Sequence, residues 1–345
     1  MRIGIDSRPM YGRPAGIGLY VRNLIENLKS IKSLDLVEFG PKSPRVLWHF
    51  NTYLSLVFSK KVDYYLSTHS YLIPCLPYVK SVLVVHDLSV CLFPGEYPFK
   101  LVILTRLFLK LALYRTKHII VPSQATKDDL VKLFGVSPDK VSVIYHGVEF
   151  SGKKAPLPNN LMKSPFCLFV GTIQPRKNLV LLIEAFASLA NDYGGKPKLV
   201  ICGEKGWKYE EVFEAVEKLN LKNRVIFLGY VSEAEKFTLF KNAAFLVLPS
   251  LYEGFGLPAV EAFYSGCPVV CSNIGALSEI GGDAALYFNP RKKEELEAQM
   301  KKVFDWYFRK DKEYKNLVEK GKTRASLFSW EKTARETFEV FKKVK

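Results

Sequence analysis

The chain has 345 residues, of which 48% are apolar and 24% are charged, and its mean hydropathy is close to zero. Such a chain can bury sizeable cores, which excludes an intrinsically disordered protein, and its length favours two domains. The formal net charge of +16 is typical of proteins that act on nucleic acid, at anionic membranes or on phosphorylated substrates. Because no helix-turn-helix, zinc-finger or RNP-like pattern accompanies this charge, nucleic acid is not an expected partner.

The start of the chain and its cysteines bear on the compartment. No secretory signal precedes the first strand-like run, and no run of about 18 apolar residues predicts a transmembrane helix. No Cys-x-x-Cys pair is present, and most cysteines lie in apolar runs, so we expect a cytoplasmic protein with buried, reduced thiols. The six cysteines are Cys75, Cys91, Cys167, Cys202, Cys267 and Cys271.

Strand-like and helix-like runs alternate along the first half. The predicted elements are strands at 2–5, 81–85, 118–121 and 140–144, and helices at about 18–29 and at 123–134, the latter with Ser123 as its N-cap. The apolar runs are typical of parallel strands that are buried on both faces. The alternation predicts a doubly wound parallel sheet.

The alternation pauses at 149–164, where Pro, Gly, Asn and Lys predict a linker, and then resumes. The predicted strands of the second half are 166–170, 198–202, 224–228, 244–248 and 268–271, with helices between them and an amphipathic helix at 330–343. We therefore expect an α/β protein with two Rossmann-like, doubly wound domains facing each other across a cleft. The predicted boundaries are 1–155, 163–328 and a final segment at 329–345.

In the first half, two groups follow predicted strands. Gly16 and Gly18 belong to a loop that leads into a helix, although a Gly-x-Gly alone is also an ordinary strand–helix turn. His86 and Asp87 follow the strand at 81–85, where ligands bind in parallel sheets. A His beside an Asp is often structural, but Asp87 could also orient His86 or receive a proton from a substrate.

The loop after the strand at 166–170 carries two adjacent cations, Arg176 and Lys177, just before a helix that we expect to start near Asn178. The guanidinium fork and the ammonium, beside the N–H groups of a helix start, suit a diphosphate. A solvated surface pair is the alternative. No Asp-x-Asp motif for a metal-bound diphosphate is present, so we expect no metal and no cofactor beyond the donor substrate itself.

Two carboxylates, Glu253 and Glu261, flank a glycine-containing turn after the strand at 244–248. Pro258 suits the first position of a helix, which would place Glu261 in the first helical turn. Carboxylates accept hydrogen bonds from hydroxyl groups, so this pair can hold a polyol such as ribose or a hexose. The alternative is that Glu261 complements the helix dipole while Glu253 is solvated.

These motifs resemble the glycosyltransferases of family 4, which have the GT-B fold. The resemblance spans the chain and lies in Gly171 to Leu179, which matches G-x-x-x-x-R-K-N, and in Glu253 to Glu261, which matches E-x7-E. It implies that Arg176 and Lys177 neutralise the donor's pyrophosphate, that Glu253 contacts the donor sugar and that Glu261 binds the nucleotide ribose. It also implies that His86 contacts the hexose and that the last helix crosses back onto the first domain.

Two weaker candidates follow the next strands of the second half. Gly203 and Lys205 lie in a glycine-containing loop that the family places near the base and phosphates, and Tyr230 and Val231 resemble the segment that faces the base. Turn formation alone is the alternative for these glycines. The predicted donor-binding residues are thus Gly16, Gly18, Gly171, Arg176, Lys177, Gly203, Lys205, Tyr230, Val231, Glu253, Gly254, Phe255, Gly256, Leu257 and Glu261, and the predicted catalytic residues are His86, Asp87, Arg176, Lys177 and Glu253.

Two stretches of the first half mix apolar and basic residues, namely 46–50 with Lys60 and Lys61 after it, and 99–117. Such a mixture suits docking at the inner face of an anionic membrane, and helix packing in a core is the alternative.

The resemblance implies a retaining hexosyltransferase with a nucleoside diphosphate sugar as donor and a glycan or lipid-linked acceptor. Likeness to bacterial polysaccharide mannosyltransferases favours GDP-mannose as the donor, with UDP-glucose as an alternative. There are two alternative functions. One is a nucleotide-sugar hydrolase or epimerase with the same fold, and the other is a non-catalytic module that binds nucleotide or anionic glycan.

Overall fold

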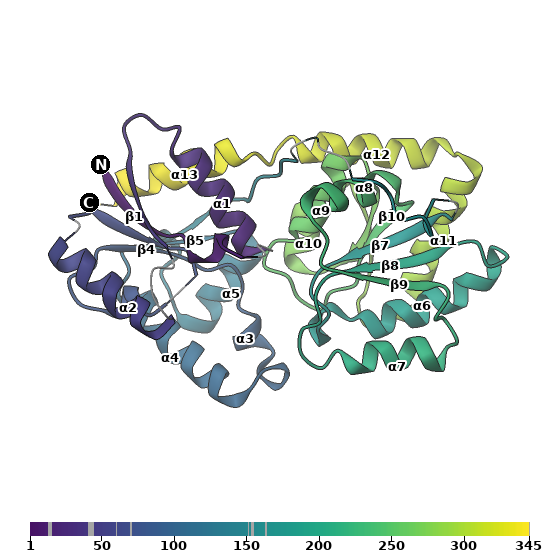
Figure 1. Cartoon of the computed structure of the whole chain (residues 1–345), viewed down its shortest axis with the longest axis horizontal. Coiled ribbons are helices and arrows are strands. Elements are labelled where there is room, and N and C mark those ends of the chain that lie inside the picture. Colours follow the sequence, from purple (N-terminus) through teal and green to yellow (C-terminus); the bar gives the residue numbers. More distant parts are fainter. Residues whose placement is uncertain are drawn as a thin grey trace. The chain divides into compact units, whose positions relative to one another are not determined.

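The structure is a computed structural model that describes residues 1–12, 16–40, 45–59, 61–69, 71–150, 152, 155–162 and 164–344. It divides into an N-terminal unit, Met1–Gly147 with Phe328–Lys345, and a C-terminal unit, Val148–Leu327. Each unit is a six-stranded, wholly parallel sheet with helices on both faces (Figure 1), so the predicted pair of doubly wound α/β folds is confirmed.

The sheet of the N-terminal unit has the order β2-β1-β3-β4-β5-β6. Its strands are β1 (Arg2–Asp6), β2 (Asp35–Phe39), β3 (Tyr64–Ser67), β4 (Ser81–Val84), β5 (His118–Val121) and β6 (Val141–Val143). The order reverses between β1 and β3, so the loops that leave these two strands run to opposite faces of the sheet. Ligands bind at such a reversal in open α/β sheets.

This unit has two main cores, one on each face of the sheet, because successive side chains of a strand point to opposite faces. Val82 and Val84 pack with α1 and α13, whereas Leu83 and Val85 pack with α3, α4 and α5. The helices are α1 (Ile17–Leu28), α2 (Arg45–Leu54), α3 (Ser89–Leu92), α4 (Phe99–Arg115), α5 (Gln124–Phe134) and α13 (Trp330–Lys343), with short helical turns η1 (Arg8–Met10), η2 (Ser55–Ser59), η3 (Ile73–Cys75), η4 (Pro94–Glu96) and η5 (Pro138–Lys140).

The last helix, α13, belongs to the N-terminal unit. Trp330, Phe338 and Phe341 are buried beside α1. Gly147 makes room for its start, because a Cβ at this position would lie 2.2 Å from the backbone nitrogen of Trp330. Only glycine fits so close a backbone crossing.

The sheet of the C-terminal unit has the order β12-β11-β10-β7-β8-β9. Numbered within the unit, this order is 6-5-4-1-2-3, the Rossmann arrangement, with its reversal between β7 and β10. The strands are β7 (Phe166–Val170), β8 (Lys198–Cys202), β9 (Val225–Gly229), β10 (Phe245–Leu248), β11 (Val269–Ser272) and β12 (Ala285–Phe288).

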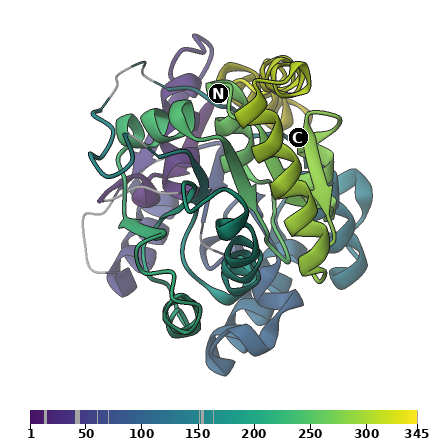
Figure 2. The same cartoon turned by 90° about the vertical axis from the view of Figure 1, so that its right-hand side faces the viewer.

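Helices cover both faces of this sheet, as Figure 2 shows from the side of the C-terminal unit. Helices α6, α7 and α11 share one core with the strands, and α9 packs with α8, α10 and α12. The helices are α6 (Leu179–Asp192), α7 (Glu210–Lys218), α8 (Glu233–Asn242), α9 (Leu257–Ser265), α10 (Gly275–Gly281), α11 (Lys293–Arg309) and α12 (Lys312–Ala325), preceded by the 3₁₀ turn η6 (Pro175–Lys177).

Most predicted elements are present, with ends shifted by one or two residues, and Ser123 caps α5 as predicted by accepting a hydrogen bond from the Thr126 nitrogen. The segment predicted as a linker instead packs on the C-terminal unit where it is described, with Phe150 and Leu161 buried and the backbone of Ala155 bonded to the Thr238 hydroxyl. All six cysteines are free thiols, and only Cys75 is not fully buried. Across the described ranges, no helix has the length and apolar character that crossing a membrane requires.

Candidate active site

The candidate site of the C-terminal unit forms where its strand order reverses. The loop after β7 carries Arg176 and Lys177, and the loop after β10 carries Ser250 and Glu253. Since β7 and β10 are hydrogen-bonded neighbours whose helices leave toward opposite faces, their loops diverge and leave room at the carboxyl edge. The sheet topology therefore brings together two motifs that lie about 75 residues apart in sequence.

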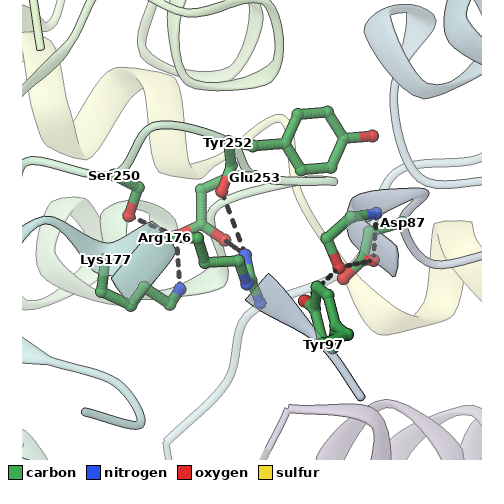
Figure 3. A network of polar contacts seen from close by, with 8 residues as sticks. Asp87, Tyr97, Arg176, Lys177, Ser250, Tyr252 and Glu253 are labelled. Carbon is green, nitrogen blue, oxygen red and sulfur yellow. Dashed lines mark hydrogen bonds and ion pairs between the residues drawn. The ribbon is translucent and has the colours of Figure 1, made fainter. Parts of the chain in front are cut away.

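Glu253 is the centre of this group (Figure 3). Its Oε1 accepts a hydrogen bond from the Ser250 hydroxyl at 2.7 Å and an ion-pair contact from the Lys177 ammonium. Its Oε2 lies 3.3 Å from a terminal guanidinium nitrogen of Arg176, which also donates to the Tyr252 carbonyl at 3.0 Å. The three charged side chains are nearly buried, so their positions are fixed by one another.

The charges of this group are set by their neighbours. Burial works to raise the pKa of Glu253, but Lys177 and Arg176, with hydrogen bonds from Lys177 and Ser250, lower it to about 2. Glu253 is therefore an ionised acceptor at neutral pH and cannot act as an acid there. The carboxylate has about four lone pairs that can accept hydrogen bonds, and the two cations together have about eight N–H donors. The group can therefore bind an anion and a hydroxyl while keeping its internal contacts.

A backbone turn presents the two cations. Residues Pro175–Lys177 form one 3₁₀ turn that ends at Asn178 in the left-handed conformation, with φ of 56°. The Asn178 amide donates to the carbonyls of Pro249 and Pro290 at 3.2 and 2.8 Å, which ties the turn to the loops after β10 and β12. The helix predicted to start near Asn178 begins at Leu179, so both cations precede a helix as expected.

Glu261 has a partner that the sequence analysis did not identify. The Lys236 ammonium lies 2.6 Å from Glu261 Oε1 and 2.9 Å from Glu233 Oε1. Burial lowers the pKa of Lys236, but the two carboxylates more than reverse this effect, so the net direction is upward. The prediction that Glu261 lies in the first helical turn is wrong: α9 begins at Leu257, Pro258 is its second residue, and Glu261 is a full turn further in.

The loops after β7 and β8 lie against each other. A Cβ at Gly203 would lie 2.0 Å from the Gly171 carbonyl oxygen, and Ile173 pairs with Lys205 in a short parallel bridge. Gly203 is thus required by loop packing, whatever its role toward a ligand. The Lys205 ammonium lies over the Tyr209 ring at 4.8 Å, which is a cation–π contact.

The remaining donor candidates of this unit lie at the same edge of the sheet. Tyr230 and Val231 directly follow β9 and are partly exposed. Of residues 254–257, the first three end the loop between β10 and α9 and Leu257 is the first residue of α9. Phe255 is buried, and Gly256 is in the left-handed region with φ of 95°. A Cβ at Gly256 would lie 2.5 Å from the Leu277 side chain, so this glycine is required by conformation and by space.

The N-terminal unit holds the other candidates. Gly16, with φ of 48°, precedes α1, and Gly18 is buried in its first turn. Gly16 is required by its backbone angle alone, because a Cβ there would contact nothing within 4 Å. Residues 13–15, which complete the predicted loop, lie outside the described residues.

His86 and Asp87 follow β4 as predicted. His86 Nε2 lies 2.8 Å from the Thr68 carbonyl, which can only accept, so Nε2 carries the proton and Nδ1 is an acceptor. Burial lowers the pKa of His86 to about 4, so the ring is neutral at physiological pH. Asp87 Oδ1 accepts from the Ser89 backbone at 3.0 Å and hydroxyl at 2.7 Å, and the Tyr97 hydroxyl donates to that of Ser89 (Figure 3).

Several polar residues of these groups are not among the predicted site residues. Ser250 stands three residues before Glu253 and Asn178 directly after the cations, so proximity to the motifs could have identified them. For Lys236 the sequence offers only an indirect signal, the capping box that fixes the start of α8. In the N-terminal unit, buried Asp6 holds Arg8 through two contacts of 2.9 and 2.6 Å, at the reversal of strand order.

The described side chains offer no group of three or more His, Cys, Asp or Glu residues arranged to hold a metal ion. The expectation of a metal-independent reaction is not tested by this observation and stays a prediction.

Two family models match the chain, one to each unit. The model described as "Glycosyl transferases group 1" matches residues 154–324, and the one described as "Glycosyltransferase Family 4" matches residues 27–151. The boundary between the two matches falls close to the boundary between the two structural units.

Similar proteins include bacterial glycosyltransferases. O-antigen chain mannosyltransferase B of Escherichia coli is 28% identical over 76% of this chain and 70% of its own length. O-antigen chain mannosyltransferase RfbU of Salmonella typhimurium is 32% identical over 64% and 60%. A Campylobacter jejuni enzyme named as a diphospho-undecaprenol 4-alpha-N-acetylgalactosaminyltransferase is 33% identical over 66% and 61%, so the chain spans less than two thirds of the last two relatives.

Solved structures share the fold over nearly the whole chain. Sucrose-phosphate synthase of Thermosynechococcus elongatus has a TM-score of 0.81 at 19% identity, covering 99% of this chain and 98% of that one. HepE of Anabaena, solved with UDP-glucose, has a TM-score of 0.78 at 17% identity, covering 99% and 100%. The paired family matches, the two doubly wound sheets and these neighbours show that the chain belongs to the group 1 glycosyl transferases, glycosyltransferase family 4, with the GT-B fold.

Proposed function

We propose that the protein is a retaining hexosyltransferase that transfers mannose from GDP-mannose to a glycan or lipid-linked acceptor. The observation that carries this proposal is the group of Arg176, Lys177 and Glu253 at the strand-order reversal of the C-terminal unit. Two cations and one carboxylate leave a net positive charge beside the start of a helix, in the place where such sheets bind nucleotides.

The cations suit the leaving group. When the bond between C1 of the sugar and the β-phosphate oxygen breaks, negative charge develops on that oxygen and must be stabilised. Arg176 and Lys177 are held by Glu253 before any ligand arrives, so little reorganisation is needed when this charge appears. We propose that these two side chains supply the stabilisation without a metal ion.

The carboxylates suit the sugars of the donor. Because Glu253 stays ionised, it can accept a hydrogen bond from a hexose hydroxyl, and Glu261 can do the same for the ribose. In the N-terminal unit, neutral His86 has Nδ1 as an acceptor, which suits a further hexose hydroxyl. Gly171, Gly203, Lys205, Tyr230, Val231 and residues 254–257 are proposed to line the nucleotide, and Gly16 and Gly18 to approach the diphosphate.

Retention of configuration requires that the new bond form on the face that the old bond leaves. In the proposed step the acceptor oxygen bonds to C1, the bond from C1 to the phosphate oxygen breaks, and the acceptor proton passes to the departing phosphate. This scheme follows the family resemblance and needs no side-chain nucleophile. Asp87 is an alternative proton acceptor in the N-terminal unit.

The choice of mannose rests on the relatives. Two of them are named as O-antigen chain mannosyltransferases, whereas HepE was solved with UDP-glucose, so UDP-glucose is the alternative donor. The Campylobacter relative is named for a diphospho-undecaprenol acceptor, which supports a lipid-linked acceptor here. A lipid-linked acceptor would place the protein at the inner face of a membrane.

A donor panel with and without acceptor tests this proposal. The purified protein is incubated with GDP-mannose or UDP-glucose and with lipid-linked or free glycans, and nucleotide release is measured. We expect GDP release that depends on acceptor, an α-linked product by NMR, and no loss of activity with EDTA. Lys177→Ala should abolish turnover, whereas Lys218→Ala, an exposed lysine of α7, should not.

Three results would overturn parts of the proposal. Sugar release that does not depend on acceptor would assign a hydrolase. Binding of nucleotide without turnover of any donor and acceptor pair would assign a non-catalytic module. A product with inverted configuration at C1 would exclude the proposed step, in which the new bond forms on the face that the old bond leaves.

A further inference from the structure

Helix α4 carries large apolar side chains around its whole circumference, although only one side of it is buried. Leu109, Ala112 and Leu113 pack into the core beneath β4 and β5. On the opposite side, Leu104, Leu107 and Leu111 recur at the spacing of one helix face and are 51%, 51% and 44% exposed. A surface helix of a globular protein carries polar residues on that side, so this outer stripe is not explained by the fold.

Cations lie among the outer leucines. Lys100, Lys110 and Arg115 are exposed on the same helix, and Phe99 and Tyr114 stand exposed near its two ends. Long basic side chains can place their charged ends at the level of lipid headgroups while their stems lie along apolar surface. Exposed Phe and Leu beside Lys and Arg are typical of helices that lie in the plane of a membrane interface.

A second exposed apolar segment lies close by in the fold. Phe58, in the turn η2 that follows α2, is 78% exposed, and Phe50 of α2 is also exposed. Trp48 of α2 shares a small core with Ile73 of η3, and η3 in turn contacts α4. Helices α2 and α4 therefore both pack against η3. We call the exposed residues Phe50, Phe58, Leu104, Leu107 and Leu111, with the exposed cations of α4, the α2–α4 surface.

The sequence around this surface is almost free of negative charge. Residues 39–127 contain eleven Lys or Arg and three Asp or Glu, and residues 97–127 contain no carboxylate side chain. An anionic partner would be attracted by the exposed cations of α4 and would meet almost no opposing carboxylate.

We infer that the α2–α4 surface docks on a bilayer that contains anionic phospholipid, with the outer leucines of α4 and the η2 phenylalanine entering the interface. A protein partner fits less well, because protein interfaces are depleted in lysine at their centre and exposed Lys100 and Lys110 stand beside this stripe. The inference concerns the lipid surface alone and does not depend on which sugar or nucleotide the protein uses.

Co-sedimentation with lipid vesicles tests the inference, using the full chain without donor or acceptor. Vesicles of phosphatidylcholine alone are compared with an equal mixture of phosphatidylcholine and phosphatidylglycerol. We expect binding to the mixed vesicles that weakens with added salt, and much weaker binding to the neutral ones. Lys100→Gln with Lys110→Gln should weaken binding to the mixed vesicles and leave the weak binding to neutral ones unchanged.

A matched pair of variants locates the surface. Leu107→Glu should weaken binding to the mixed vesicles by about tenfold or more, because an apolar contact is lost and a repelled charge is added. Leu327→Glu makes the same change at a residue of the C-terminal unit with the same exposed fraction, 51%, and should bind like the unmodified protein. Both sites are exposed, so both variants should keep the melting temperature of the unmodified protein.

Three outcomes would overturn the inference. One is no binding of the unmodified protein to anionic vesicles, and another is equal binding by the Leu107 and Leu327 variants. The third is a dimer in solution that Leu107→Glu dissociates while vesicle binding is absent, which would assign the surface to a second copy of the chain. None of these outcomes bears on donor turnover with a water-soluble acceptor, so the proposed function is tested separately.

Discussion

The ammonium of Lys236 lies 2.6 Å from Oε1 of Glu261, and both side chains are buried. Lys236 comes from α8 and Glu261 from the second turn of α9, so this pair links two neighbouring helices of the C-terminal unit. Glu261 is also the proposed ribose acceptor. The same carboxylate thus contributes to helix packing and to the proposed donor site.

Replacing Lys236 should therefore lower the free energy of unfolding more than replacing an exposed lysine. Burial raises the pKa of Glu261, and Lys236 opposes this effect. Lys236→Met leaves the Glu261 carboxyl buried without its ammonium, so we expect the free energy of unfolding to fall by about 3 kcal/mol. Lys236→Met combined with Glu261→Leu should recover much of that loss, because the remaining partner, Glu233, is partly exposed and can be solvated. Urea unfolding of the two single variants and the double variant measures the coupling, and additive losses would show that the two residues do not interact.

The lowered pKa of Glu253 should make the stability of the folded protein depend on pH in the acidic range. Its pKa is lowered from an ordinary value of 4.5 to about 2, so between these values the unfolded chain binds a proton that the folded protein does not. Stability gained from Glu253 is therefore complete above about pH 5 and lost as the pH falls toward 2, with a total of about 3 kcal/mol. In urea unfolding, the difference in stability between the unmodified protein and Glu253→Gln should grow as the pH rises from 2 to 5. A difference that stays constant over this range would contradict the charge assignment.

His86 should stay neutral well below its ordinary titration range. Burial lowers its pKa to about 4, and the contact of Nε2 with the Thr68 carbonyl selects the tautomer with the proton on Nε2. NMR of a protein with ¹⁵N-labelled histidine should show this tautomer at pH 7 and no titration of the ring above about pH 5. A midpoint near 6.5 would contradict the effect of burial on the pKa of His86, and a proton on Nδ1 would remove the proposed hydroxyl acceptor.

Gly147 should be intolerant of any side chain. A Cβ there meets the backbone of Ser329 and Trp330, which no rotamer change can move, so Gly147→Ala must displace the start of α13. We expect a loss of about 2 kcal/mol or more in the unfolding of the N-terminal unit. Gly95→Ala, in the same unit with open space around its Cβ, should change stability by less than about 0.5 kcal/mol. Equal thermal melting of the two variants would contradict the close crossing of α13.

The sequence predicted the architecture because buried parallel strands leave a strong signal. The runs at β7 and β8 are continuous apolar stretches between turn residues, and their predicted bounds match the structure. The strands β2, β3 and β12 are absent from the prediction because they have only four or five residues each. In addition, β2 and β12 are edge strands, and Asp35 and Glu38 reduce the apolar signal of β2. The composition of segment 149–164 predicts a linker, but composition does not contain the contact between the rings of Phe150 and distant Phe237, which ties the segment to the C-terminal unit.

The candidate site was predicted as two motifs and not as one group. Adjacent residues such as Arg176 and Lys177 can be recognised from their position after a strand. Their contact with Glu253 depends on β7 and β10 being neighbours, which local sequence patterns do not contain. The Lys236 contact depends in the same way on the packing of α8 against α9. The pairing of charged residues that lie far apart in the sequence is thus the feature of the site that only the structure shows.

The most direct test of the proposed donor site compares GDP with guanosine. Calorimetric titration measures the affinity of each for the unmodified protein and for Lys177→Ala, since the two ligands differ only in the diphosphate. We expect the affinity for GDP to fall by about 10- to 100-fold in Lys177→Ala, the value of a charged hydrogen bond, while the affinity for guanosine changes less than about twofold. An unchanged affinity for GDP, or an equal loss for both ligands, would contradict the assignment of Lys177 to the pyrophosphate.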